Sequence, residues 1–357
     1  MSESPDLSLE LETVACPLCG SDEHKLLFVG RDPLYHIPGD FPVVRCAACR
    51  HVYLNPRPTL ADITKCYPDH YGPYQTGEQP AEQQPETETP GSNTSSTETK
   101  RPWYLSRWAK GIPGLKPLYH WLMNDRAFYF PEDVPAPRTA LDVGCSSGGL
   151  LEKLRQRGWD AEGVEIAEAP AQVARDRGFR VHTGTLESAR FESARFDAVF
   201  ALMVLEHLHD PQRALAEIYR ILAERGQLIF SVPNFACWER FVFRGYWRGL
   251  ELPRHLQHFT PRVLRRLLKE VGFDDVRILH QSNTNNIVAS LGMWLRDYFP
   301  RRTWGQRLLD FTDNPRLAGT LLLSPLAKFL ALVRQGGRLT VVARKVSSVE
   351  REASAID

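Results

Sequence analysis

The chain has 357 residues, of which 43% are hydrophobic and 24% charged, enough apolar material for one large domain or two unequal ones. Its formal net charge of +1 excludes a strong overall positive field, so nucleic acid is disfavoured as the main partner. The N-terminus has neither a basic start nor an apolar core, which argues against a secretory signal and predicts a cytoplasmic location.

The first predicted element is a small metal-binding module at residues 11–74. It contains two C-x-x-C pairs, whose four thiolates can close a tetrahedral zinc site with no open position for catalysis. Few large aliphatic residues lie in this segment, so zinc would supply part of its folding free energy. A pair of redox dithiols is the alternative interpretation, and Cys66 is not expected to be a ligand. The four predicted zinc ligands are Cys16, Cys19, Cys46 and Cys49.

Residues 75–101 are predicted to be a disordered linker. Between 78 and 100 the sequence contains no aromatic residue and a single alanine as its apolar content, so it cannot repay the entropy cost of ordering. The linker separates the module from a larger domain at 102–346.

From residue 139 onward, strand-like and helix-like segments alternate, which is typical of a parallel sheet with helices on both faces. Two helices are predicted to begin with a capping residue followed by proline, at Asp210–Pro211 and Thr260–Pro261. A helical insert is predicted at 286–335, before the last strand. The seven predicted strands are 139–145, 160–166, 180–184, 196–203, 226–234, 273–281 and 338–346. The predicted helices are 149–158, 169–178, 210–222 and 260–272.

The stretch LDVGCSSGG at 141–149 joins the first strand to its helix and allows two interpretations. As G-x-S-x-G it is similar to the turn that presents a nucleophilic serine in α/β-hydrolases, but that turn needs several strands before it. As a nucleotide-binding turn it needs an acidic residue at the end of the second strand, where Glu165 stands. Ser146 replaces the middle glycine of a dinucleotide motif, so a ligand without phosphate fits better.

Residues 139–282 resemble a class I methyltransferase that depends on S-adenosylmethionine (SAM). The matching stretches are LDVGCSSGGLL, VEIA, FDAVFALMVLEHLHDPQRALAEIYRIL and GQLIFSVPN, in the order and spacing of that family. The resemblance implies a seven-stranded Rossmann-like α/β sheet, SAM as cofactor and methyl transfer as the activity. The implied SAM-binding residues are Asp142, Gly144, Ser146 and Gly148 at the methionine end, Glu165 at the ribose, and Thr185, Leu186, Glu187, Ala201, Leu202 and Met203 at the adenine.

A four-cysteine module followed by HVYLNPRPT and a methyltransferase domain resembles a group of bacterial methyltransferases that act on sugars and small molecules. This resemblance implies a sugar or small-metabolite acceptor, nucleotide- or lipid-linked, in polysaccharide or secondary-metabolite biosynthesis. An RNA methyltransferase and a zinc-dependent binding protein with an inactive methyltransferase domain are the alternatives. The six basic residues of the module do not form a dense patch, so the sequence carries no strong nucleic-acid signal.

The stretch RHLQHFT at 254–260 follows the fifth strand and resembles the E-H-x-x-Y-F-S segment of the sugar C-methyltransferases. By this resemblance His255 is the general base, because a neutral imidazole can take a proton from a hydroxyl or an acidified carbon. Arg254 replaces the glutamate of that segment and His258 its tyrosine, so O-, N- and C-methylation all stay open. A loop histidine bonded to a backbone carbonyl is the alternative interpretation of His255.

The segment LEHLHD at 205–210 places Glu206 and His207 after the fourth strand. They are candidates for orienting the acceptor or holding a divalent cation, and capping of the next helix is the alternative. The insert at 286–335 combines aromatic residues with arginines, which suits an acceptor lid, peripheral contact with a membrane or a plain helical cap. Its apolar run at 317–333 is interrupted by Pro325 and Lys328, which favours core packing.

Overall fold

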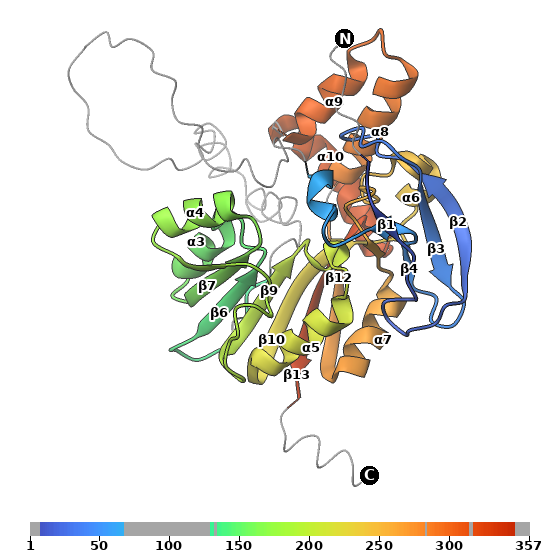
Figure 1. Ribbon diagram of the computed structural model, residues 1–357. Helices are drawn as coiled ribbons and strands as arrows, with labels where there is room; N and C mark the ends of the chain where they lie inside the picture. Colours follow the sequence, from blue (N-terminus) through green and yellow to red (C-terminus); the bar gives the residue numbers. More distant parts are fainter. Residues whose placement is uncertain (1–7, 68–128, 132–133, 283, 314–316, 347–357) are drawn as a thin grey trace, which may run out of the picture.

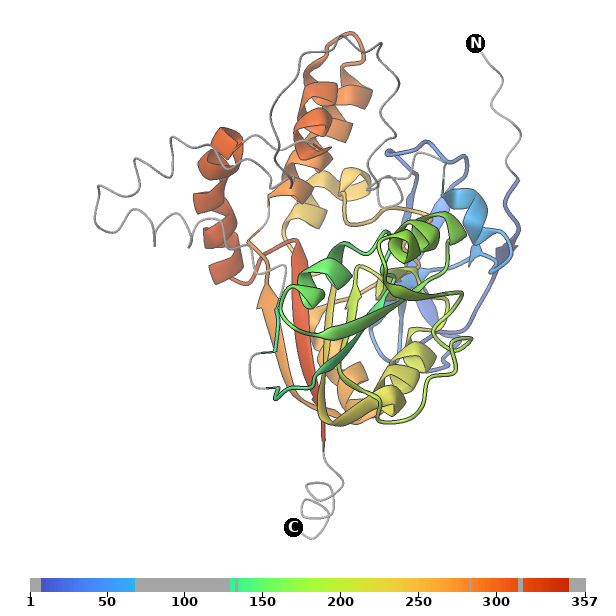
Figure 2. The ribbon, with the colours of Figure 1, turned by 90° about the vertical axis from the view of Figure 1, so that its left-hand side faces the viewer.

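The computed structural model describes residues 8–67, 129–131, 134–282, 284–313 and 317–346 (Figure 1). The predicted linker at 75–101 lies outside the described residues, as does the end of the predicted module at 68–74. The described chain forms a central sheet with helices on both faces, a helical insert at one end of the sheet and a cysteine-containing module beside it (Figures 1 and 2).

The central sheet has seven strands in the order β12-β13-β10-β9-β6-β7-β8, which confirms the predicted α/β fold. The strands are β6 (Thr139–Val143), β7 (Asp160–Glu165), β8 (Arg180–Thr183), β9 (Phe196–Leu202), β10 (Leu222–Pro233), β12 (Phe273–His280) and β13 (Arg338–Lys345). Strand β13 runs antiparallel to both β10 and β12, whereas the alternating pattern predicted a parallel sheet. The chain leaves β12 at the edge where the insert lies and returns from that same edge, so β13 runs the opposite way.

Four helices cover the two faces of the sheet, α3 (Gly149–Arg155), α4 (Glu168–Asp176), α5 (Pro211–Ile221) and α7 (Pro261–Val271). Successive side chains of a strand point to opposite faces. Ala140 therefore joins the core that contains Leu154 of α3, and Leu141 joins the core that contains Leu215 of α5 and Leu264 of α7.

The predicted helix starts are confirmed at atomic level. The side chain of Asp210 accepts a hydrogen bond from the backbone N–H of Arg213 at 2.9 Å, and that of Thr260 accepts one from Val263 at 3.4 Å. A proline follows each cap at the first helical position, where its missing N–H costs nothing.

The insert before the last strand consists of α8 (Asn285–Tyr298), α9 (Trp304–Asp313) and α10 (Leu317–Leu332). Helices α8 and α9 pack against each other, with Ala289, Met293 and Leu309 in their shared core. Figures 1 and 2 both show the insert beyond the edge of the sheet that lies opposite the C-terminus. None of the described helices is long and apolar enough to cross a membrane.

The cysteine-containing module shares a sheet with the larger domain. Its elements are β1 (Leu11–Glu12), β2 (His24–Gly30), β3 (Phe41–Cys46), β4 (Val52–Leu54), β5 (Arg57–Pro58) and η1 (Ile63–Cys66). Strand β11 (Gln257–His258) of the larger domain pairs with β4 and completes a four-stranded sheet in the order β11-β4-β3-β2. The backbone on both sides of the contact is thereby hydrogen-bonded, and the segment that follows β10 is held by the module.

Candidate active site

The four predicted zinc ligands meet at one point of the module. The Sγ atoms of Cys16 and Cys49 lie 3.4 Å apart, those of Cys19 and Cys46 lie 3.5 Å apart, and all four lie within 4.8 Å of one another. Each C-x-x-C pair folds as a tight turn, with backbone bonds from Gly20 to Cys16 and from Arg50 to Cys46. Cys66 lies elsewhere, in η1. The cluster has the ligand number and softness that a structural zinc ion requires.

The donor cradle, residues 142–148 with Glu165, lies at the carboxyl ends of β6 and β7. Gly144 has a φ of 74°, and a Cβ there would come within 2.7 Å of the Val204 side chain, so only glycine fits. Gly148 also has a positive φ, of 84°, and begins α3. The turn therefore brings backbone close to the space above the strand ends, as a ligand cradle needs.

Two buried carboxyl groups, Asp142 and Glu165, lie in the donor cradle. Glu165 accepts hydrogen bonds from the backbone N–H of Ser146 at 2.9 Å and of Ala167 at 3.0 Å. Burial, reinforced by the charge of Glu165, raises the pKa of Asp142 to about 8. A cationic group placed here would restore the ionised form of Asp142, which suits the ammonium and sulfonium of SAM.

The remaining predicted SAM residues line the same edge of the sheet. Thr185, Leu186 and Glu187 follow β8, and Leu186 is buried. Ala201 and Leu202 end β9, next to β6 in the sheet. The neighbouring Met203 has a φ of 59° and donates its N–H to Ser231 of β10 at 2.9 Å. The parallel strands thus bring all the predicted SAM residues to one edge, with Glu206 and His207 just beyond β9.

Three of the four predicted catalytic side chains form a cluster, which we call the acceptor cluster: Glu206, His207 and His255. Their ligand atoms lie within 4.8 Å of one another, and the two imidazole rings meet edge to face with centroids 4.6 Å apart. Glu206 lies in η3 (Leu205–His207), directly after β9, and is fully buried. Both of its carboxylate oxygens lack a hydrogen-bond partner among the described residues.

A backbone carbonyl fixes the protonation of His255. Nδ1 of His255 lies 3.0 Å from the carbonyl oxygen of Gly249, and because a carbonyl only accepts, this ring carries its proton on Nδ1 and keeps a lone pair on Nε2. Nδ1 of His207 lies 3.2 Å from the carbonyl oxygen of Arg254. The contact to Gly249 is the backbone bond expected in the alternative interpretation of His255, yet it also prepares Nε2 to take a proton or bind a cation.

Around the acceptor cluster, neighbouring charges oppose the effect of burial on the pKa of His255 and of Glu251. Burial lowers the pKa of His255 well below its usual value, although the Glu251 carboxylate, 3.7 Å from Nε2, acts the other way. Burial alone would raise the pKa of Glu251, but the guanidinium groups of Arg248 and Arg254 hold it far below its ordinary range. Glu251 therefore stays ionised and His255 stays neutral at physiological pH.

The acceptor cluster has the donor set of a divalent cation site. Two imidazole nitrogens and one carboxylate suit zinc, iron or manganese, and the carbonyls behind both histidines resemble the outer partners of metal ligands. Burial raises the pKa of Glu206 to about 8, so without a nearby cation this side chain is largely protonated at neutral pH. The same groups can thus bind a cation or exchange a proton with an acceptor.

His258 lies apart from the acceptor cluster. It sits on β11 opposite Val52 of the module, and its ring lies 5.4 Å from that of Phe235. Burial lowers its pKa to about 3, so it stays neutral. His258 is therefore part of the contact with the module.

Arg254, which occupies the position of the family's glutamate, is fully buried in the same contact. Its guanidinium donates to both carboxylate oxygens of Asp32 in the module, at 2.9 and 3.1 Å, and to the backbone oxygen of Cys66 at 3.1 Å. A fork of this kind fixes both partners in one orientation. Asp32 thereby anchors the backbone that carries His255.

Tyr67 of the module also reaches the acceptor cluster. Its hydroxyl lies 2.9 Å from Nδ1 of His207. The sequence alone did not identify these partners. No motif or spacing links Tyr67 or Asp32 to the histidines, and Glu251 was not singled out either. The one available signal was the ELPRH stretch, in which Glu251 precedes His255 by four residues.

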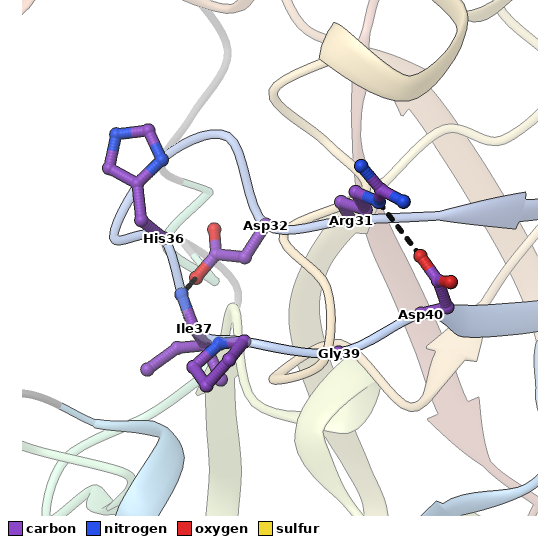
Figure 3. Close-up of a pocket in the computed structure, with 7 residues that line it drawn as sticks. Arg31, Asp32, His36, Ile37, Gly39 and Asp40 are labelled. Carbon is purple, nitrogen blue, oxygen red and sulfur yellow. Dashed lines mark hydrogen bonds and ion pairs between the residues drawn. The ribbon is translucent and has the colours of Figure 1, made fainter. Parts of the chain in front are cut away.

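A hollow lies in the loop between β2 and β3, on the module side of Asp32 (Figure 3). It measures about 390 Å³ and is lined by Arg31, Asp32 and residues 36–40. Arg31 and Asp40 form an exposed ion pair at 2.8 Å across its base, and Asp32 points into the loop toward the N–H of Ile37. None of the predicted site residues is among the described residues that line it.

Comparisons with known proteins agree with this geometry. Residues 119–278 match a family model described as a methyltransferase domain. A ubiquinone biosynthesis O-methyltransferase from Hahella chejuensis is 33% identical over 155 residues, covering 41% of this chain and 65% of the relative. A protein of the same name from Aromatoleum aromaticum is 29% identical over 171 residues, covering 44% of this chain and 73% of the relative.

Solved structures show a weaker likeness. A Haloferax volcanii structure containing the Trm112 methyltransferase activator aligns with a TM-score of 0.45 and 18% identity, covering 69% of this chain and 96% of that chain. The chain spans between 42% and 65% of the length of three curated relatives that it matches. The match to 119–278, the order of the strands and the glycine turn identify a methyltransferase domain in this chain, which also carries a four-cysteine cluster.

Proposed function

We propose that this protein transfers the methyl group of SAM to a hydroxyl of a sugar or other small metabolite, with His255 as the general base. The observation that carries the proposal is the adjacency of the donor cradle and the acceptor cluster. Gly144 of the cradle packs against Val204, two residues before Glu206, so the two sites share one edge of the sheet.

The proposed reaction is a direct displacement at the methyl carbon. The acceptor oxygen forms a bond to that carbon while the carbon–sulfur bond of SAM breaks, and S-adenosylhomocysteine leaves. The hydroxyl proton passes to Nε2 of His255, whose Nδ1–H stays bonded to the Gly249 carbonyl. The Glu251 carboxylate, 3.7 Å from Nε2, stabilises the imidazolium that forms.

The acceptor is proposed to be polar at its reacting end. Glu206 is fully buried there and both of its carboxylate oxygens lack a hydrogen-bond partner among the described residues, so a purely apolar group would leave them unpaired. Relatives that are named as O-methyltransferases support oxygen as the accepting atom, and phenolic and sugar hydroxyls both have it.

Labelled SAM tests this proposal. Purified protein is incubated with labelled SAM and an extract of cells that lack it, and the labelled products are separated. His255→Ala is expected to lower transfer by about 10²–10⁴-fold while SAM affinity changes less than about threefold, because a general base contributes about that much to the rate. Asp142→Ala is expected to weaken SAM binding itself. His24→Ala, which removes an exposed histidine of β2, serves as the matched control.

The outcomes separate the alternatives. Full transfer by His255→Ala would overturn the role of this histidine. SAM binding without transfer to any fraction of the extract would instead favour a binding protein with an inactive domain, and labelled RNA would favour an RNA methyltransferase.

We also propose that the four-cysteine cluster holds a structural zinc ion. Elemental analysis of the purified protein is expected to find one zinc ion per chain bound there, and Cys46→Ser is expected to lose it because three thiolates bind zinc far more weakly than four. Cys66→Ala removes a thiol outside the cluster and keeps the backbone oxygen that Arg254 uses, so it should retain the metal. Retention of that zinc by Cys46→Ser would overturn the assignment.

A further inference from the structure

The insert exposes aromatic and arginine side chains where α8 ends and α9 begins. We call residues 294–307 the tip. Its large apolar side chains form contacts with one another at the surface: the Trp294 ring lies 5.3 Å from Tyr298 and 6.2 Å from Phe299. The exposed residues of the tip include Trp294, Tyr298, Phe299, Arg301, Arg302, Trp304 and Arg307.

The packing of α8 on α9 explains why these rings point outward. The two helices approach so closely at Gly292 and Gly305 that a Cβ on Gly305 would lie 2.4 Å from a backbone nitrogen of α8. Their shared core is filled by smaller or unbranched side chains, among them Met293 and Leu309. The aromatic rings are therefore not needed for the core, and Tyr298 stays 63% and Trp304 53% exposed.

A second apolar stripe belongs to the same insert and lies along α10, which Figure 2 shows to one side of α8 and α9. It consists of Leu322, Leu326 and Phe329 together with Val333 just after the helix, spaced four, three and four residues apart. All four side chains are exposed among the described residues, and Leu322 is 80% exposed. The sequence favoured core packing for this run, and the structure leaves one face of it uncovered by the described chain.

The charge of the insert is strongly positive. Residues 286–335 contain seven arginines and lysines and three aspartates, although the whole chain has a net charge of only +1. Arg302 also stacks over the Trp304 ring, with the guanidinium carbon 5.4 Å from the ring centre. Aromatic side chains beside arginines suit the boundary between lipid headgroups and acyl chains.

We propose that the tip and the α10 stripe bind the surface of an anionic lipid bilayer. The tip projects from the fold as a protruding hairpin end, which suits insertion into a soft headgroup layer (Figures 1 and 2). The binding is peripheral, since no described helix is long and apolar enough to span the bilayer. Helix α8 connects the tip to the loop that precedes His255, since its Ser290 hydroxyl accepts a bond from the N–H of Arg248 at 2.9 Å.

Vesicle flotation with the full-length protein tests this proposal independently of methyl transfer. The wild type is expected to float with vesicles of phosphatidylcholine and phosphatidylglycerol and much less with phosphatidylcholine alone. Phe299→Ser combined with Trp304→Ser is expected to weaken binding to the anionic vesicles at least tenfold. Arg301→Gln combined with Arg302→Gln should weaken it by about fivefold for each arginine removed, because each basic side chain near such a surface contributes about that factor.

Leu26→Ser combined with Val29→Ser provides the matched control, because these β2 side chains are about as exposed but lie outside the insert. Unchanged SAM affinity verifies that each variant is folded, and the arginine pair decides the question if the serine pair does not fold. The proposal is overturned if the wild type does not float with anionic vesicles or if both tip variants bind like the control. It is also overturned if light scattering without lipid shows a dimer that the tip variants dissociate, since the tip would then contact a second copy.

Discussion

The donor cradle and the acceptor cluster lie at the same edge of the sheet but are built in different ways. The cradle comes from one continuous segment, β6 to the end of β7, and its turn is held by backbone bonds to Glu165. The acceptor cluster joins η3 to the segment before β11, and module residues Asp32 and Tyr67 hold both of them. A site within one strand–turn–helix unit is set by local sequence, whereas the acceptor cluster depends on the module being in place.

Asp32→Ala should give the largest loss of stability. It should disturb the acceptor cluster and leave the donor cradle unchanged. It leaves the Arg254 guanidinium buried without its main partner, which is expected to lower the free energy of unfolding by about 3–5 kcal/mol. Urea denaturation measures this, and SAM affinity should change less than about threefold because the cradle does not contact Asp32.

Asp40→Ala is the matched control for Asp32→Ala. It breaks the Arg31–Asp40 pair of the same loop, in which both side chains are largely exposed, so the free energy of unfolding is expected to stay nearly unchanged. Equal losses for the two variants would contradict the view that burial makes the Asp32–Arg254 pair important.

Glu206→Gln tests the electrostatics of the acceptor cluster through pH. Burial raises the pKa of Glu206 in the folded protein to about 8, from an ordinary value of 4.5. Between these values the folded state holds a proton that the unfolded state has lost, so stability falls as pH rises. The glutamine variant lacks this loss, and its melting temperature should exceed that of the wild type by on the order of 5 °C at pH 8, with little difference at pH 4.5.

Thermal denaturation at the two pH values, with no divalent cation added beyond the zinc of the four-cysteine cluster, makes this comparison. A glutamine variant that is less stable than the wild type at high pH would contradict the prediction. It would show that Glu206 is ionised and paired with a cation in the folded protein.

Ser146→Gly should have the smallest effect and sharpens the description of the donor cradle. Ser146 has a φ of 47°, which glycine adopts without strain, and its backbone N–H to Glu165 is kept. The free energy of unfolding should change by less than about 1 kcal/mol and SAM affinity by less than about threefold. Gly144→Ala is the contrasting variant, because its Cβ would clash with Val204, and it should weaken SAM binding at least tenfold. Denaturation and calorimetry measure both variants.

Much of the fold was predictable because its signals are local. Strand and helix periods, the caps at Asp210 and Thr260 and the glycine of the first turn each act within a few residues. The antiparallel direction of β13 was not predictable, because it depends on the edge from which the chain returns after the insert. The candidate site also has a locally encoded part and a part that depends on distant contacts. A motif identified Asp142 and Glu165. No motif marked Glu251, Asp32 or Tyr67.

The sequence by itself determined the donor side of this protein, since a glycine turn and a carboxylate one strand later have few other uses. It also placed the four cysteines at a spacing that suits a single zinc ion. Only the tertiary structure decided the neighbours of His255. Of two histidines three residues apart, one joins Glu206 and His207 and the other faces the module. The physical reason is that β11 pairs with β4 and Arg254 pairs with Asp32, contacts between residues about 200 positions apart that no local pattern records.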